Sequence, residues 1–288
     1  MTLSATWSLF DSLRKGSVKE NTTKGVDRFA KNNLIAALSD KPIEEYTSLD
    51  ILKFIQVELN KPRKPEGVNM HLRSIKTFGR WCTKHKLLSS DNPFATLDFI
   101  PTKDKQIRYL SEEEFKRIWE TEKIGEYRFI YLCGLLTALR VSDLLALKFS
   151  QIDFHNWTIV IVQKKTQRRI TIPIHPELRE PLLHAQIAAK GRDSIWEKER
   201  TVGAVSHHFT KVAKRAKVKG ISFHGLRKTC ASWLVQKGVP ILNVSTLLGH
   251  SSVLLTQRMY GSLAPSNLQN DVLQIPIPTG SIPLKVRH

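Results

Sequence analysis

The sequence predicts a mainly α-helical protein with a small β-hairpin sheet, an α+β fold built from two domains. Apolar side chains recur every three or four positions over most of the 288 residues, as they do on the buried face of a helix. Two short runs, 157–162 and 170–174, are instead rich in β-branched residues, which favour strands. A chain of this length also exceeds the roughly 100–200 residues of a single domain, so we expect two.

Residues 1–90 are predicted to form the first domain, which is all helical. Helical spacing begins at Thr22 and continues to Leu88, with clear runs over 49–59 and 70–82. The second run carries basic residues at i, i+3, i+7 and i+11, a spacing that places them on one helix face. These residues are Arg73, Lys76, Arg80 and Lys84. Few acids accompany them, so we expect this face to contact DNA phosphates; a solvated face is the alternative.

A linker is expected at 91–108, where helical spacing stops after Ser89–Pro93 and no new periodicity replaces it. The second domain is predicted over 109–261. It opens with Ser111–Glu114, a capping box whose Ser hydroxyl and Glu carboxylate can each accept a hydrogen bond from a free backbone N–H. Helices are then expected to continue through Leu147.

A hairpin comes next, with the predicted strands 157–162 and 170–174 joined by the turn Lys164–Gln167. The rest of the domain is expected to be helical to Gly261. The last segment, 262–288, contains repeated prolines and cannot hold a long helix.

The composition indicates a polyanionic partner. The chain has 45 Lys and Arg against 26 Asp and Glu, a net charge of +19, which favours nucleic acid over an anionic membrane. The longest apolar stretch, 129–139, is shorter than the roughly 20 residues that a bilayer requires. Met1–Ser12 lacks the basic start and apolar core of a secretion signal, so we expect a cytoplasmic protein.

No cofactor or metal is expected. Cys82, Cys133 and Cys230 are far apart within apolar helical patterns, which favours reduced thiols in the core. His207 and His208 lack the short ligand spacing of a zinc site. The sequence also lacks the glycine-rich loop with Gly-Lys that binds nucleotide phosphates, so we predict a reaction without ATP.

Three short segments carry residues suited to phosphate chemistry: 138–147, 223–229 and 247–252. Cleaving a phosphodiester without a metal requires other groups that neutralise the charge of the pentacoordinate transition state. Two guanidiniums can bind both non-bridging oxygens and stay charged throughout. Arg140 and Arg227 are the candidates for this role.

Two histidines accompany these arginines. His224 lies three residues before Arg227, so both side chains can face one phosphate from the same helix. His250 follows Gly249 at a predicted turn, where its imidazole can donate a hydrogen bond or move a proton. A lysine in the hairpin turn is long enough to protonate the departing 5′ oxygen.

Tyr260 is the candidate nucleophile, at the end of the last predicted helix. Of the five tyrosines in the chain, it alone follows all three segments, and a phenol can form a covalent bond to phosphorus. A buried structural tyrosine is the alternative.

This ordered set of segments resembles the tyrosine recombinase or phage integrase family, relatives of the type IB topoisomerases. The resemblance covers nearly the whole chain and implies a helical core-binding domain followed by a catalytic domain. It assigns catalysis to Arg140, Lys165, His224, Arg227, His250 and Tyr260, with Asp143 as a supporting acid. Lys164 is the fallback for Lys165, since Lys-Thr before a basic strand is similar to the family's Lys-Thr-Gly hairpin. The residues expected to bind DNA are Arg73, Lys76, Arg80, Lys84, Lys164 and Arg168.

Met259 is an apparent extra residue between the Gly-His pair and Tyr260, compared with the family pattern. On a helix, one residue rotates a side chain by about 100° and advances it by about 1.5 Å. The turn expected over 251–256 could absorb the insertion, Tyr260 could be presented in an unusual way, or the enzyme could be impaired.

The resemblance implies a site-specific recombinase that cleaves and rejoins double-stranded DNA through a 3′-phosphotyrosine, without metal or ATP, as a tetramer assembled on DNA. It leaves open a need for accessory DNA-bending or excision factors. The tail 262–288 could dock on a neighbouring protomer or be disordered. A start at the core-binding region leaves no room for an arm-binding domain. The alternatives are a catalytically inactive DNA-binding relative and a sequence-tolerant type IB-like topoisomerase.

Overall fold

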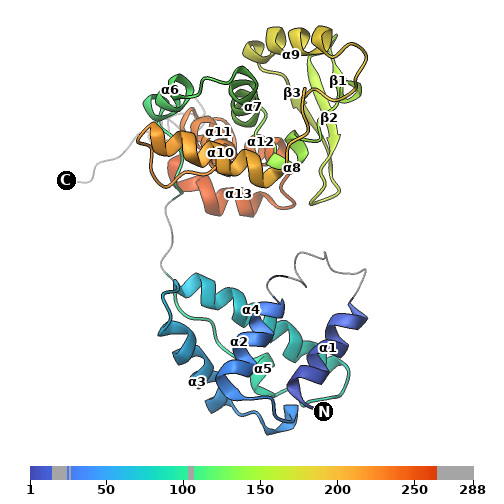
Figure 1. Cartoon of the computed structure of the whole chain (residues 1–288), viewed down its shortest axis with the longest axis vertical. Coiled ribbons are helices and arrows are strands. Elements are labelled where there is room, and N and C mark those ends of the chain that lie inside the picture. The colour runs from blue at the N-terminus through green and yellow to red at the C-terminus, as the bar shows by residue number, and fades with distance from the viewer. Residues whose placement is uncertain (15–24, 26, 103–106, 265–288) are drawn as a thin grey trace, which may run out of the picture. The chain divides into compact units, whose positions relative to one another are not determined.

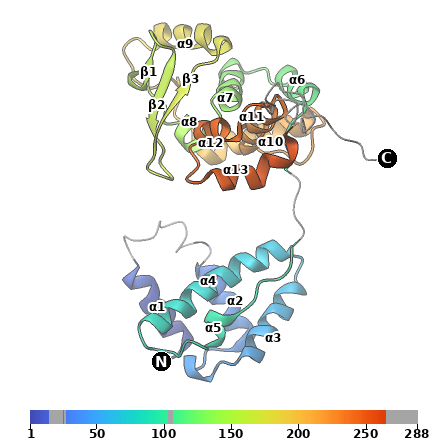
Figure 2. The same ribbon diagram turned by 180° about the vertical axis from the view of Figure 1, so that it is seen from behind.

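The computed structural model describes residues 1–14, 25, 27–102 and 107–264. The chain divides into two compact units, Met1–Lys105 and Gln106–His288, whose elements are labelled from opposite sides in Figure 1 and Figure 2. The predicted tail docking concerns residues 265–288, which lie outside the described part of the chain. Over the described residues, no helix combines the length and apolarity needed to cross a membrane.

The first unit is helical over its described residues, as predicted for residues 1–90, but it extends into the predicted linker 91–108, where residues 93–96 form a helix. Its elements are α1 (Leu3–Leu13), α2 (Arg28–Leu38), the 3-10 turn η2 (Ile43–Glu45), α3 (Ser48–Leu59), α4 (Pro65–Lys84) and α5 (Pro93–Thr96). Helix α1 was not predicted, although Leu3, Trp7 and Phe10 have helical spacing and are buried. The Thr2 side chain accepts a hydrogen bond from Ala5 N and thereby caps this helix.

Helix α4 lies at the centre of this unit's core. Phe78 on its apolar face stacks on Trp7 of α1, with 4.4 Å between ring centroids. Helix α5 contacts α4 at Gly79, where a Cβ would come within 2.5 Å of the backbone of Phe94 and Ala95. Since the apolar face of α4 is buried, its basic residues point outward.

The second unit is mainly helical and has one small antiparallel sheet (Figure 1). Its helices are α6 (Glu112–Thr121), α7 (Gly125–Leu136), α8 (Val141–Leu144), α9 (Pro176–Ala188), α10 (Val202–Arg215), α11 (His224–Gln236), α12 (Ile241–Leu248) and α13 (Val253–Tyr260). Its strands and 3-10 turns are β1 (Ile152–Asp153), β2 (Thr158–Val162), β3 (Arg169–Pro173), η3 (Phe149–Gln151) and η4 (Gly261–Leu263). The capping box predicted at Ser111 and Glu114 is present.

The sheet has the strand order β1-β2-β3. Strands β2 and β3 form the predicted hairpin, in a register that pairs Ile159 with Ile172 and Ile161 with Ile170. All four isoleucines are buried, so one face of the hairpin packs against the core of the unit. Strand β1 pairs with β2 but was not predicted, because two residues are too few to show an alternating pattern.

The helical run predicted through Leu147 is interrupted, which corrects that expectation. Helix α7 ends at Leu136 and the short α8 begins only at Val141. Between them, Ala138 has a φ of 52°, a left-handed conformation that residues with a Cβ rarely adopt. Because of this break, Arg140 is the N-cap residue of α8 rather than part of a continuous helix.

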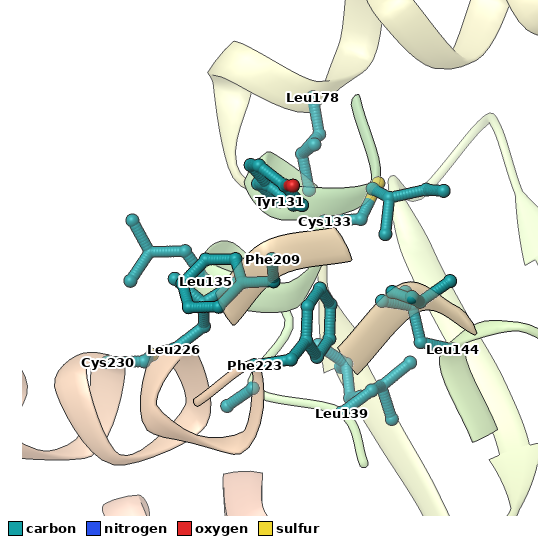
Figure 3. Close-up of a cluster of buried hydrophobic side chains, with 14 of the residues drawn as sticks. Tyr131, Cys133, Leu135, Leu139, Leu144, Leu178, Phe209, Phe223, Leu226 and Cys230 are labelled. Carbon is teal, nitrogen blue, oxygen red and sulfur yellow. The ribbon is translucent and has the colours of Figure 1, made fainter. Parts of the chain in front are cut away.

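Aromatic contacts join α7, α10 and α11 in the core of this unit (Figure 3). Phe209 of α10 packs edge-to-face on Tyr131 of α7 and on Phe223, with 5.0 and 5.6 Å between centroids. Gly134 of α7 allows close approach, since a Cβ there would lie 2.9 Å from the ring of Phe223. The three cysteines are buried free thiols, as predicted. Because Phe223 immediately precedes α11, this packing holds the start of that helix against α7 and α10.

Candidate active site

Arg140 projects from the break between α7 and α8. Its Nη1 donates a hydrogen bond of 2.8 Å to Oε1 of Gln163, the residue that follows β2. The guanidinium is therefore tied to the hairpin, 23 residues further along the chain.

Arg227 lies in the first turn of α11 and is only 4% exposed. Its Nη1 donates to the carbonyl oxygen of Ala138 at 2.7 Å, and its Nη2 donates to that of Leu248 at 2.6 Å. Burial lowers the pKa of Arg227 to about 10, and the charge of Arg140 acts in the same direction. With this pKa, the guanidinium stays charged at neutral pH.

His224 and His250 are both held in the neutral form at pH 7. Burial lowers the pKa of His250 to about 4, and the charges of Arg227 and Arg140 add to this effect. The pKa of His224 is also lowered, chiefly by burial and then by Arg227. His250 follows Gly249, whose left-handed backbone caps α12. Its Nδ1 is 2.8 Å from Thr256 Oγ1 of α13.

Tyr260 ends α13 and is only 2% exposed. Burial raises the pKa of Tyr260 to about 12, while the Arg227 guanidinium opposes this rise. Helix α13 begins at Val253 and runs without a break to Tyr260, so the turn expected over 251–256 is shorter than predicted. Despite the apparent extra residue Met259, the phenol is close enough to Arg227 for each group to affect the pKa of the other.

The six residues that the sequence assigned to catalysis form one electrostatic cluster. Arg140, Arg227 and Lys165 all lower the pKa of His224, and Tyr260 raises that of Arg227. The cluster thus combines fixed cations, neutral imidazoles and a phenol. Such a group of side chains can bind a phosphate anion and present a nucleophile to it.

Besides the bond from Arg140 to Gln163, further hydrogen bonds anchor the hairpin loop between β2 and β3 beside this cluster. The backbone N of Lys164 donates to Asp143 Oδ1 at 2.9 Å, and Arg168 Nη1 donates to the carbonyl oxygen of His250 at 2.7 Å. Asp143 is 4% exposed and raises the pKa of Arg227. Arg168, expected to bind DNA, therefore lies beside the site, and the side chains of Lys164 and Lys165 are exposed.

Gln163 and Thr256 belong to this arrangement, but sequence reasoning did not identify them. Gln163 is completely buried. It stands two residues after Ile161 and four after Ile159, so strand alternation places it on the buried side of β2. A polar residue at a core-facing position was the signal that could have revealed it.

The basic face of α4 belongs to the other unit. Arg73, Arg80 and Lys84 are exposed there, as their spacing predicted, and Lys76 is half-buried. Lys76 Nζ donates to the carbonyl oxygen of Leu97 at 2.8 Å.

Comparison with known sequences gives a consistent result. A sequence model of the Phage integrase family matches residues 108–266. The chain is 28% identical over 232 residues to a XerC-like tyrosine recombinase of Caldanaerobacter subterraneus subsp. tengcongensis, covering 66% of this chain and 58% of that protein. It is 26% identical over 229 residues to tyrosine recombinase XerC of Pediococcus pentosaceus, covering 70% and 73%. It is 30% identical over 236 residues to the integrase of Salmonella phage P22, covering 75% and 58%.

Solved structures share the fold. A lambda integrase tetramer bound to a Holliday junction superposes with a TM-score of 0.75 at 20% identity, covering 88% of this chain and 78% of that one. The Tn1549 transposon integrase in complex with transposon right end DNA gives 0.81 at 19% identity, covering 95% and 98%. At these identities the likeness shows the fold alone, whereas the sequence model matches more than half of the chain. The chain therefore belongs to the phage integrase family.

Proposed function

We propose that this protein is a site-specific DNA recombinase that cleaves and rejoins DNA through a covalent 3′-phosphotyrosine at Tyr260. The observation that carries this proposal is the position of Arg227. It lies close enough to both Arg140 and Tyr260 to interact electrostatically with each, so that cations and nucleophile can act on the same phosphate.

In the proposed reaction, Arg140 and Arg227 bind the non-bridging oxygens of the scissile phosphate. The phenol oxygen of Tyr260 attacks phosphorus, the bond to the 5′ oxygen breaks, and Lys165 donates a proton to that oxygen. Because the pKa of Tyr260 is about 12, the phenol must lose its proton during the attack. A neutral imidazole, His224 or His250, can accept it.

Rejoining reverses these steps with a different strand. The 5′ hydroxyl of a partner strand attacks the phosphotyrosine, which releases Tyr260 and restores a phosphodiester. The covalent bond conserves the energy of the broken diester, so the reaction requires no ATP. The two guanidiniums supply the charge that a metal ion supplies in other phosphoryl-transfer enzymes.

The proposed partners are double-stranded DNA and further copies of the chain, assembled as a tetramer on DNA. The lambda integrase structure, a tetramer on a Holliday junction, supports this arrangement. We assign Arg73, Lys76, Arg80 and Lys84 of α4, together with Lys164 and Arg168 of the hairpin loop, to contacts with the DNA backbone. Such contacts position a protein on DNA without selecting a sequence.

Covalent capture from a random pool tests the proposal for any target sequence. The protein is incubated with nicked duplexes that carry a randomised segment around the nick. The nick lets the short fragment with the newly formed 5′ hydroxyl diffuse away after cleavage, so that the strand joined to Tyr260 stays attached. DNA that stays attached to protein on a denaturing gel is recovered, amplified and selected again. We expect an adduct for the wild type and for Tyr109→Phe, and none for Tyr260→Phe.

Absence of a wild-type adduct after repeated selection would support the inactive DNA-binding relative. An adduct that persists in Tyr260→Phe would overturn the assigned nucleophile. Intact duplexes with the selected sequence then distinguish the remaining alternatives. Recombinant products between two duplexes support a recombinase, whereas relaxation of a supercoiled plasmid with no strand exchange supports a topoisomerase.

A further inference from the structure

We propose that Gln163 is a positioning residue, which orients Arg140 and couples it to Arg227 and to the loop that carries His250. The inference rests on the proposed function and adds a residue outside the six assigned to catalysis. Gln163 is completely buried and directly follows β2. Both the oxygen and the nitrogen of its side-chain amide form hydrogen bonds.

The side-chain oxygen of Gln163 accepts two hydrogen bonds. One comes from Arg140 Nη1 at 2.8 Å and the other from Thr166 Oγ1 at 2.7 Å. The amide nitrogen donates to the carbonyl oxygen of Leu248 at 3.2 Å. The oxygen therefore joins Arg140 to the hairpin turn next to Lys165, and the nitrogen joins both to the end of α12.

The carbonyl oxygen of Leu248 is shared between Gln163 and Arg227. It accepts from Arg227 Nη2 at 2.6 Å as well as from the Gln163 amide. A continuous path of hydrogen bonds thus connects the two guanidiniums. Like charges repel each other, and Arg140 lowers the pKa of Arg227. Gln163 provides the anchor that holds Arg140 at a defined place near the second cation.

An uncharged acceptor suits this position better than an acid does. A carboxylate would form an ion pair with Arg140 and compete with the phosphate for the guanidinium. Its second oxygen would also face the carbonyl oxygen of Leu248, where the Gln163 amide now donates. Glutamine can therefore orient Arg140 and leave its charge available to the DNA.

Gly249 independently indicates that the Gln163 side chain occupies a defined place in the site. Its φ is +59°, and a Cβ there would lie 2.6 Å from the Gln163 amide nitrogen. The glutamine side chain thus occupies the space that a side chain at position 249 would need. Since His250 follows directly, Gln163 packs against the turn that presents the imidazole.

The test compares Gln163→Met, which keeps the length of the side chain and removes its hydrogen bonds, with Gln186→Met on the exposed surface of α9. The substrate is the duplex obtained by covalent capture, and the rate of adduct formation is measured. We expect Gln163→Met to be about 10- to 100-fold slower, the value of a hydrogen bond to a charged group. Gln186→Met is expected to match the wild type.

A neutral substrate separates positioning of Arg140 from a general structural role. In this duplex a methyl group replaces one non-bridging oxygen of the scissile phosphate and removes its negative charge. Orientation of Arg140 matters less there, so the defect of Gln163→Met should become much smaller. DNA binding in the Tyr260→Phe background and the melting temperature Tm should show that the variant is folded. If Gln163→Met is not folded, Gln163→Glu is tested instead. We expect it to show the same slower adduct formation on the phosphodiester and the same smaller defect on the neutral substrate.

Each outcome decides the inference. An equal defect on both substrates, or no defect on the phosphodiester, overturns the role of Gln163 while the proposed function stands. If the wild type forms no adduct with any substrate, the proposed function fails and the inference fails with it. A defect confined to the charged substrate supports it.

Discussion

Arg227 Nη2 donates a hydrogen bond of 2.6 Å to the carbonyl oxygen of Leu248, the last residue of α12. The other terminal nitrogen of this guanidinium binds the carbonyl oxygen of Ala138. Leu248 lies two residues before His250, and Ala138 lies two residues before Arg140. One buried side chain of α11 therefore links the segment that carries Arg140 to the segment that carries His250.

Substitution Arg227→Lys should break this link, because a single ammonium cannot bind both carbonyl oxygens in the geometry of a planar guanidinium. We expect a loss of about 1–3 kcal/mol in the free energy of unfolding, the cost of a buried unpaired acceptor. Adduct formation should slow by about 100-fold or more. Urea unfolding and covalent capture measure the two effects. Arg258→Lys, on the exposed side of α13, is the control and should change neither.

Lys165 and Lys164 can be distinguished by changing the leaving group. Lys165→Ala should slow adduct formation by about 10²- to 10⁴-fold, the range for loss of a general acid. A duplex with sulfur in place of the 5′ bridging oxygen should restore the rate, since a thiolate leaves without a proton. Lys164→Ala should retain the rate of adduct formation on both duplexes at saturating DNA, because the hydrogen bond to Asp143 comes from its backbone N, which alanine keeps. The opposite pattern would assign the general acid to Lys164.

Gly249→Ala should destabilise the second unit and impair cleavage. The φ of +59° alone costs a residue with a Cβ about 1–2 kcal/mol, and the new Cβ would also displace Gln163. Gly238→Ala is the matched control, since its φ is +79° but a Cβ would meet no atom within 4 Å. We expect both variants to lose stability in thermal unfolding, and only Gly249→Ala to lose adduct formation. Equal activity in the two would show that the contact with Gln163 is dispensable.

His250 should make the second unit less stable in acid. Its pKa falls from the ordinary 6.5 to about 4, first through burial and then through Arg227, Arg140 and His224. Between these values the unfolded chain binds more protons than the folded one, so stability decreases as the pH falls from 6.5 through 4. His250→Gln should show a smaller decrease in Tm over this range than the wild type. His184→Gln, at an exposed position, should follow the wild type, and a wild-type slope in His250→Gln would contradict the prediction.

Gly79 should be intolerant of a side chain, because a Cβ would lie 2.5 Å from the backbone of α5. Gly79→Ala should therefore separate α4 from α5 and lower the Tm of the first unit. Gly67 lies in the same helix with nothing within 4 Å of its Cβ position. Gly67→Ala should instead stabilise this unit by about 0.5–1 kcal/mol, through its better helix propensity. Similar shifts in the two variants would argue against close packing at Gly79.

Much of this arrangement could be predicted from the sequence because the signals are local. The Ser111 capping box and the outward basic spacing on α4 depend only on neighbouring residues, and the structure contains both. Helix α1 had the spacing of Leu3, Trp7 and Phe10 but was missed. The two-residue strand β1 is too short to show the alternation of apolar and polar residues that indicates a strand. The left-handed Ala138 was unexpected, since nothing in an alanine's neighbours indicates that conformation.

The sequence by itself determined most of the helical elements, the hairpin, and a set of chemically suited side chains in a particular order, because each depends on residue type and spacing. Only the tertiary structure decided how those side chains are held. The bonds from Arg227 to Leu248 and Ala138 join residues 21 and 89 positions apart, and the amide of Gln163 reaches 85 positions to Leu248. The bond to Ala138 joins the end of α7 to α11, two helices that pack closely at Gly134, and this is a contact between distant segments that local spacing does not contain.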